Sequence, residues 1–149
     1  MSDAPRTGRC LCGAVTFRAG RLGDHGVCHC GMCRRWTGGP LFGVTVKRAN
    51  MTIEGAAHVR AVRTSAWTTR CRCAECGSPL WYRYDKGEDG AGDYEVPIGL
   101  LDDASGLTIR NEINVDGCPD AIRLAGDHPR LTTDETLALF GVTTEGDRA

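Results

Sequence analysis

Three clusters of cysteine constrain this chain more than any other feature of its sequence. They are Cys10-Leu11-Cys12, Cys28-His29-Cys30-Gly31-Met32-Cys33 and Cys71-Arg72-Cys73-Ala74-Glu75-Cys76-Gly77. Thiolates two or three residues apart can reach one soft metal ion without straining the backbone. A structural zinc site is closed by four protein ligands, whereas a catalytic site has three and keeps one position open. The clusters therefore predict two metal sites of different kinds.

The length of the chain and its cysteines favour one domain in a reducing compartment. The 149 residues suit a single domain over residues 1–149 with one hydrophobic core. The first residues, MSDAPRTGR, lack the apolar stretch of a secretion signal. The apolar stretches around Leu41–Val46 and Val96–Leu101 are too short to cross a membrane. We therefore expect a cytoplasmic protein without a membrane partner, whose clustered cysteines bind metal rather than form disulfides.

Charge is unevenly distributed along the sequence. Residues 1–72 carry twelve Arg/Lys and three Asp/Glu (net +9), whereas residues 73–149 carry six and sixteen (net −10), which together give the overall −1. The basic part contains Cys28, Cys30 and Cys33, so an anionic small molecule is the favoured ligand there. Nucleic acid is the competing interpretation of a basic region. The chain has no recognisable nucleic-acid-binding motif, and we do not expect a nucleic-acid partner.

Residue patterning predicts a mainly β fold with a short C-terminal helix. Alternation and a bias to β-branched and aromatic residues predict strands at Ala14–Arg18, Leu41–Lys47, Met51–Glu54, His58–Arg63, Ala66–Arg70, Leu80–Tyr84, Tyr94–Leu100, Leu107–Ile109 and Glu112–Val115. Thr132 and Glu135 have the spacing of a capping box, and Gly141 stands where that helix would end. A single helical turn is expected over Cys33–Trp36.

The first predicted metal site is closed by four cysteines. Cys73 and Cys76, followed by Gly77, have the spacing of a zinc knuckle, in which glycine permits the tight turn. Cys10 and Cys12 would supply the other two ligands. A structural zinc of this kind contributes on the order of 10 kcal/mol to folding. The competing interpretation is that Cys10 and Cys12 are small buried apolar residues.

The second predicted site is the triplet Cys28, Cys30 and Cys33, which supplies three ligands and leaves a fourth position open. Three thiolates make zinc a poor Lewis acid, so capture of a thiol is favoured over generation of hydroxide. A thiol that coordinates the metal loses its proton, which suits the formation or cleavage of a carbon–sulfur bond. Three alternatives stay open: a second closed site completed by Cys71 or Cys118, an iron–sulfur cluster and a redox thiol centre. The usual spacing of an iron–sulfur motif, with proline after its last cysteine, is missing.

The residues next to the triplet are candidates for further roles. His29 lies between two ligands and would point away from the metal in an extended segment. Arg34 and Arg35 follow the last ligand directly, and a guanidinium group can hold a carboxylate through two hydrogen bonds. We therefore expect Arg34 and Arg35 to bind the substrate. The alternative is an exposed surface pair.

The combined motifs resemble one protein family. They are Gly8-Arg9-Cys10-Leu11-Cys12-Gly13-Ala14-Val15, Cys28-His29-Cys30-Gly31-Met32-Cys33-Arg34-Arg35 with Thr37-Gly38, Cys73-x-x-Cys76-Gly77-Ser78-Pro79-Leu80, Leu100-Leu101-Asp102-Asp103, and Ala125–Thr132. In order and spacing they resemble the glutathione-dependent formaldehyde-activating enzyme (GFA) family, which includes centromere protein V. The resemblance spans about residues 8–132, which we take as the core of the domain.

The resemblance implies a β-tent-like fold with two zinc ions per chain. By position, the structural ligands are Cys10, Cys12, Cys73 and Cys76, and the catalytic-zinc ligands are Cys28, Cys30 and Cys33. The implied activity is that of a carbon–sulfur lyase. It acts on adducts of glutathione, or a similar thiol, with formaldehyde or another small aldehyde, as in the synthesis of S-(hydroxymethyl)glutathione.

Two positions depart from the family pattern. Arg72 stands where the family often has an aromatic residue, and Cys118 stands where a basic residue is common. Neither is a ligand position, so the departures concern the substrate rather than the metal scaffold. The alternative function is a non-catalytic zinc module that binds a thiol, a protein partner or nucleic acid, because a shared scaffold does not by itself determine chemistry.

Overall fold

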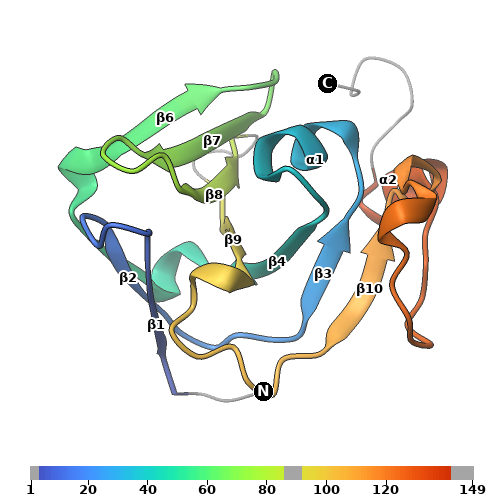
Figure 1. Ribbon diagram of the computed structural model, residues 1–149, viewed down its shortest axis with the longest axis horizontal. Helices are drawn as coiled ribbons and strands as arrows, with labels where there is room; N and C mark the ends of the chain where they lie inside the picture. The colour runs from blue at the N-terminus through green and yellow to red at the C-terminus, as the bar shows by residue number, and fades with distance from the viewer. Residues whose placement is uncertain (1–3, 86–91, 142–149) are drawn as a thin grey trace. The chain divides into compact units, whose positions relative to one another are not determined.

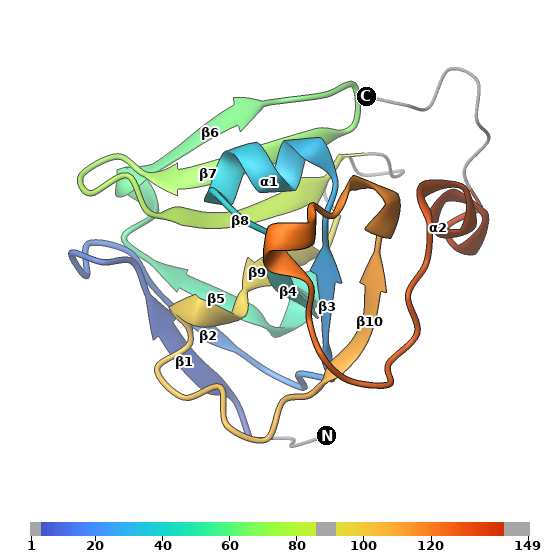
Figure 2. The ribbon, with the colours of Figure 1, turned by 45° about the vertical axis from the view of Figure 1, so that its right-hand side comes forward.

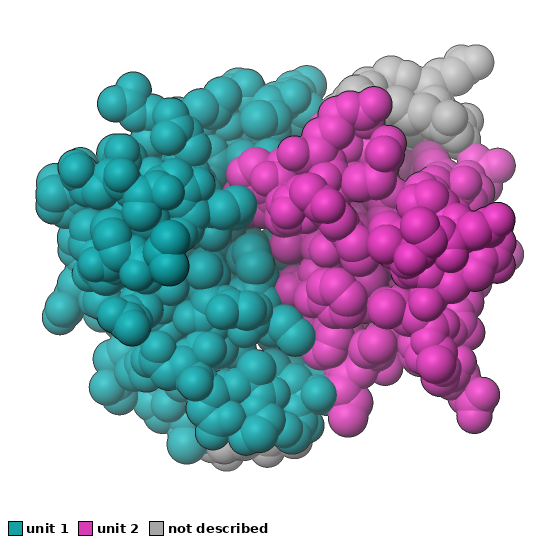
Figure 3. All heavy atoms as spheres, in the orientation of Figure 1, with its two compact units in different colours: residues 1–24, 44–107 teal, residues 25–43, 108–149 magenta. Residues whose placement is uncertain are grey.

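The computed structural model describes residues 4–85 and 92–141, which group into two compact units. Unit 1 comprises residues 1–24 and 44–107, and unit 2 comprises residues 25–43 and 108–149 (Figure 3). Each unit is thus assembled from two segments of the chain. The single-domain organisation expected over residues 1–149 stays a prediction.

Unit 1 contains two sets of antiparallel strands. The first is a three-stranded sheet in the order β1-β2-β5, whose strands lie side by side in Figure 2: β1 (Arg6–Arg9), β2 (Thr16–Ala19) and β5 (Met51–Glu54). The second has the order β9-β8-β7-β6: β6 (Val59–Arg63), β7 (Thr68–Cys73), β8 (Pro79–Tyr84) and β9 (Tyr94–Pro97). The turns after β1 and after β7 carry the four cysteines of the first predicted metal site.

The core of unit 1 is built on aromatic packing. Trp81 makes edge-to-face contacts with Phe17 and with Tyr94, at ring-centre distances of 6.0 and 5.6 Å. Buried aliphatic residues surround them, and Cys10 and Cys73 belong to the same buried cluster. Edge-to-face pairs add about 0.5–1.5 kcal/mol each beyond the area they bury. Two of the predicted metal ligands are therefore held by the core itself.

Unit 2 contains a short sheet and both α-helices. Its strand order is β10-β3-β4, in which β3 (His25–Cys28) pairs in parallel with β10 (Ile109–Ile113) and antiparallel with β4 (Leu41–Val46), as Figure 1 shows. β4 continues past Gly43 into unit 1. Helix α1 (Gly31–Thr37) follows β3 almost at once and ends at Gly38, whose φ of 79° is left-handed. Helix α2 (Thr133–Leu139) begins at the capping box of Thr132 and Glu135.

Short 3-10 helices make up the remaining helical structure. They are η1 (Arg48–Asn50), η2 (Ala56–His58), η3 (Ile98–Leu100), η4 (Val115–Gly117) and η5 (Asp120–Ile122). Within residues 4–85 and 92–141, helix length and apolarity fall short of what a membrane span requires.

The structure confirms a mainly β fold with a short C-terminal helix and corrects several boundaries. The strand Met51–Glu54 and the helix capped by Thr132 are as expected. The strand expected over Tyr94–Leu100 ends at Pro97, because proline has no N–H for the sheet, and a 3-10 turn follows. The two strands expected around residues 107–115 are one strand, β10. β1 and β3 were not predicted, since their short, glycine-containing segments show little alternation.

Substitution of Gly55 by Ala should destabilise unit 1. Gly55 has a φ of 82°, and a Cβ there would overlap the backbone carbonyl of Ala14, which lies shortly before β2. Strain of this kind costs on the order of 1–3 kcal/mol. Chemical denaturation should show that loss for Gly55→Ala. Gly99→Ala is the matched control, because the space around its Cβ is open, and it should leave the free energy of unfolding nearly unchanged. Equal stability of the two variants would contradict this interpretation.

Candidate metal centres

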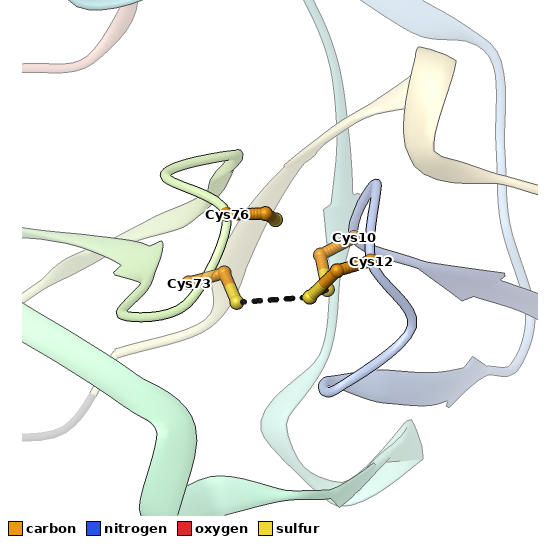
Figure 4. A group of neighbouring side chains, drawn as sticks. All are labelled: Cys10, Cys12, Cys73 and Cys76. Carbon is orange, nitrogen blue, oxygen red and sulfur yellow. Dashed lines mark hydrogen bonds between the residues drawn. The ribbon is translucent and has the colours of Figure 1, made fainter.

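Four cysteine side chains converge in unit 1 from two loops that are distant in the sequence. Cys10 follows β1 and Cys12 lies in the next turn, whereas Cys73 ends β7 and Cys76 lies in the turn before β8. Their sulfur atoms all lie within 4.8 Å of one another. Figure 4 shows the two pairs facing each other across the gap between the loops. The structure thus brings together all four residues predicted for the closed site.

The spacing of these sulfurs fits a tetrahedral metal ion. The Sγ atoms of Cys10 and Cys12 are 3.7 Å apart, and those of Cys12 and Cys73 are 3.8 Å apart. A tetrahedron with Zn–S bonds of about 2.3 Å has S–S edges of about 3.8 Å. A disulfide would need about 2.05 Å, and the described residues include all nine cysteines without a disulfide among them. Four thiolates at this spacing are the donor set of structural zinc.

Ser78 links the two cysteine loops and was missed by the sequence analysis. Its hydroxyl accepts a hydrogen bond of 3.0 Å from the backbone N–H of Leu11 and lies 3.2 Å from the Sγ of Cys76. The hydrogen bonds from Ser78 lower the pKa of Cys76 to about 5. Gly77 has the left-handed φ of 78° that the turn requires. Ser78 therefore both joins the loops and favours the thiolate form of one ligand.

The second group lies in unit 2 and is local in sequence. Cys28 ends β3, Cys30 is the N-cap residue of α1, and Cys33 lies in the first turns of that helix. Their sulfur atoms also lie within 4.8 Å of one another. The Sγ of Cys30 accepts a hydrogen bond of 3.3 Å from the backbone N–H of Cys33. The strand-to-helix transition therefore folds the three thiols of the triplet toward one point.

The three thiols of the triplet share their protons unequally. Hydrogen bonds from the side chains of Cys28 and Cys33 lower the pKa of Cys30 to about 2. The contact with Cys30 is the main cause that raises the pKa of Cys28 far above its ordinary value. The direction of the shift at Cys30 favours its thiolate, which is the form that binds a metal ion. A soft metal such as zinc fits this donor set.

A pocket of about 320 Å³ lies next to the triplet and is lined by Cys30, Gly31, Met32 and Arg35. Cys28 and Cys33 are buried, whereas Cys30 is half-buried and faces this pocket. A small molecule in the pocket would therefore meet the triplet on the side of Cys30. Of the two arginines expected to bind substrate, Arg35 lines the pocket, whereas Arg34 is an exposed residue of α1 that does not.

Residues of β10 and the segment after it surround the triplet, and the sequence analysis did not identify them. The side-chain amide of Asn114 donates a hydrogen bond of 3.4 Å to the Sγ of Cys28. Glu112 is buried and lies 2.6 Å from Nε2 of His29, through its Oε1. His29 is thus engaged with a carboxylate rather than with the metal group, in line with the expectation that it points away. The sequence of β10, Ile-Arg-Asn-Glu-Ile, gives no sign that its glutamate is the buried residue.

Two further cysteines, Cys71 and Cys118, belong to neither group within the described residues. Cys71 is buried in the core of unit 1, opposite Trp81 on β8. The pairing of β7 with β8 shifts by one residue between Cys71 and Arg72, so that Leu80 is the extra residue of a bulge in β8. Cys118 contacts the backbone carbonyls of Pro119 and Ile122. The described residues therefore do not support closure of the triplet by either cysteine.

Serine substitutions at two cysteines of β7 should separate ligation from packing. Cys73→Ser removes one of the four converging sulfurs. We expect this variant to lose one zinc equivalent and up to about 10 kcal/mol of its free energy of unfolding. Cys71→Ser is the matched control: it places a hydroxyl in the core, at a cost of about 1–3 kcal/mol, but should keep the zinc content of the parent protein. Elemental analysis and thermal unfolding provide the measurements. Equal zinc contents in the two variants would exclude Cys73 as a ligand.

Comparisons with known proteins agree with this geometry. The model of the family described as glutathione-dependent formaldehyde-activating enzyme matches residues 5–116. The chain is 25% identical over 134 residues to an uncharacterized lyase of the yeast Schizosaccharomyces pombe, covering 87% of this chain and 93% of that protein. A crystal structure of a Rhodobacter sphaeroides protein shares the fold, with a TM-score of 0.54, 22% identity, and coverage of 83% of this chain and 98% of that one. The family match spans most of the chain and includes every cysteine of both groups, and the chain belongs to the glutathione-dependent formaldehyde-activating enzyme family.

Proposed function

We propose that this protein is a zinc-dependent carbon–sulfur lyase that acts on adducts of a small thiol, such as glutathione, with formaldehyde or another small aldehyde. The family name and the lyase name of the yeast relative support the class of reaction. The observation that carries the proposal is the triplet of thiols beside a pocket that also contains an arginine. Its reduced cysteines suit the cytoplasm as the place of action.

The proposed reaction joins the sulfur of the thiol to the carbonyl carbon of the aldehyde. The carbonyl oxygen takes up the proton that the thiol loses, so the adduct contains every atom of both reactants. The reverse reaction breaks the carbon–sulfur bond, returns the proton to sulfur and releases the aldehyde. A zinc ion at the triplet would supply a site that holds the substrate sulfur in its thiolate form.

Residues of unit 2 have the remaining roles in the proposed reaction. Cys28, Cys30 and Cys33 hold the ion, and the amide of Asn114 draws charge from the sulfur of Cys28. Arg35 lines the pocket and offers its guanidinium to a carboxylate of the thiol substrate. Met32 gives the same pocket an apolar wall. We propose Arg34, on the same helix, as a source of longer-range attraction for an anionic substrate.

Replacement of Cys30 by Ser should abolish the reaction without removing the four-cysteine site. We expect the parent protein to accelerate the exchange between glutathione, formaldehyde and their adduct, as measured by NMR. The Cys30→Ser variant should lose at least about a hundredfold in rate, because a weaker, protonated hydroxyl replaces a thiolate ligand. Its zinc content should fall by one equivalent. Thiol binding by the parent protein without rate acceleration would instead indicate a non-catalytic zinc module.

Replacement of Arg35 by Met should weaken substrate binding rather than the chemical step. Loss of a charge-assisted hydrogen bond to a carboxylate should raise KM for glutathione about tenfold, with a smaller change in kcat. Arg110→Met is the matched control, because Arg110 is an exposed arginine of the same unit that does not line the pocket. It should leave KM unchanged. A thiol without carboxylates should be insensitive to Arg35→Met, and equal losses for both thiols would overturn the assignment.

A further inference from the structure

A buried carboxylate in unit 2 holds the residue between two of the metal ligands. His29 stands between Cys28 and Cys30, and its side chain is buried. The Nε2–H of His29 donates a hydrogen bond of 2.6 Å to Oε1 of Glu112. Glu112 is itself only 2% exposed. The imidazole is therefore fixed by an acceptor that cannot move to solvent.

The charge of Glu112 is balanced by groups brought from another segment. Its Oε2 accepts a hydrogen bond from Nε2 of His128 at 2.5 Å and forms an ion pair with Nε of Arg130 at 2.8 Å. Burial raises the pKa of Glu112, but the hydrogen bonds from His128 and His29, with the charge of Arg130, hold it below its usual range. A buried carboxylate is expensive unless it is paired in this way. The four side chains thus form one cluster around an ionised Glu112, in which Nδ1 of His29 lacks a hydrogen-bond partner among the described residues.

The backbone around His29 is held by the same part of the chain. The N–H of His29 donates a hydrogen bond of 3.1 Å to the carbonyl of Ile113, next to Glu112. A Cβ at Gly117 would lie 2.9 Å from the carbonyl oxygen of His29, so this glycine permits close packing. The parallel pairing of β10 with β3 places Ile113 opposite Cys28. The N–H, the carbonyl and the side chain of His29 are therefore all constrained.

We propose that Glu112 and His29 are positioning residues for the triplet, which hold the Cys28–Cys30 backbone where three thiolates converge before metal arrives. This inference rests on the proposed role of the triplet as a metal site. It goes beyond that role because it assigns the affinity of the triplet for metal to two residues outside the ligand set. Three thiolates repel one another, and a flexible loop would have to be ordered as the metal binds. A loop that is already held avoids that cost.

The test is a Glu112→Gln variant, studied as the zinc-loaded protein. All three partners of the Glu112 carboxylate are donors, and the amide of Gln would present N–H groups to at least one of them. Loss of supporting contacts around metal sites typically costs 10–100-fold in affinity. Competition with chelators of graded strength should show zinc at the triplet bound about 10–100-fold more weakly, while zinc at the four-cysteine site is unchanged. The Cys30→Ser variant identifies which equivalent belongs to the triplet.

Two further variants distinguish a specific effect on zinc binding by the triplet from a general loss of stability. Arg130→Gln removes a half-exposed partner of Glu112 and should also lower the zinc affinity of the triplet. Glu135→Gln removes an acidic residue of the same unit that lies in the cap of α2, and it should leave both zinc affinities unchanged. Excess zinc should restore lyase activity to Glu112→Gln, because positioning affects occupancy of the site rather than the chemistry.

The outcomes distinguish this inference from the proposed function. Unchanged affinity of the triplet in both Glu112→Gln and Arg130→Gln would overturn the positioning role while leaving the lyase intact. Parallel loss of both zinc ions, with unfolding, in these two variants would also overturn it, since Glu112 would then serve the fold as a whole. A parent protein that binds zinc only through its four-cysteine site would overturn the proposed function itself.

Discussion

The convergence of four thiols in unit 1 is the interaction on which the rest of that unit depends. Cys10 and Cys73 are buried in its core, and the sulfur spacings of 3.7 and 3.8 Å match the edges of a tetrahedral zinc–thiolate site. The two loops come from residues about sixty positions apart, so joining them closes a long segment of chain. A metal ion at this point would secure the turn after β1 against the turn after β7, with Ser78 as the supporting hydrogen-bond partner.

The cysteines of unit 2 form a group of a different geometry. Here three thiols lie within six residues of sequence, and the transition from β3 to α1 is enough to bring them together. The ligand that begins the helix, Cys30, faces a pocket, whereas its two partners are buried. The contrast between four thiols that meet from two distant loops and three thiols beside a pocket is consistent with the proposal of one structural and one reactive centre.

Sequence reasoning succeeded where the relevant constraint is local. Cys-x-x-Cys followed by glycine can form one kind of turn, and Cys-x-Cys-x-x-Cys can close on one ion, and the structure brings the sulfur atoms of each predicted group together. The capping box at Thr132 was recognised for the same reason. Sequence reasoning missed β3, which pairs with β10, and the roles of Ser78, Asn114 and Glu112. Each of these depends on a partner that is remote in sequence.

The spacing of its cysteines determined the ligand chemistry of this protein, because thiolates a few residues apart have few geometries in which they can meet a metal. Tertiary structure decided which cysteines remained outside the two groups and what surrounds each group. Cys71 is a core residue that packs in unit 1 opposite Trp81 of β8, and Glu112 came to hold His29 because β10 pairs with β3. Strand register is set by packing over the whole unit, and a single segment carries too little information to specify it.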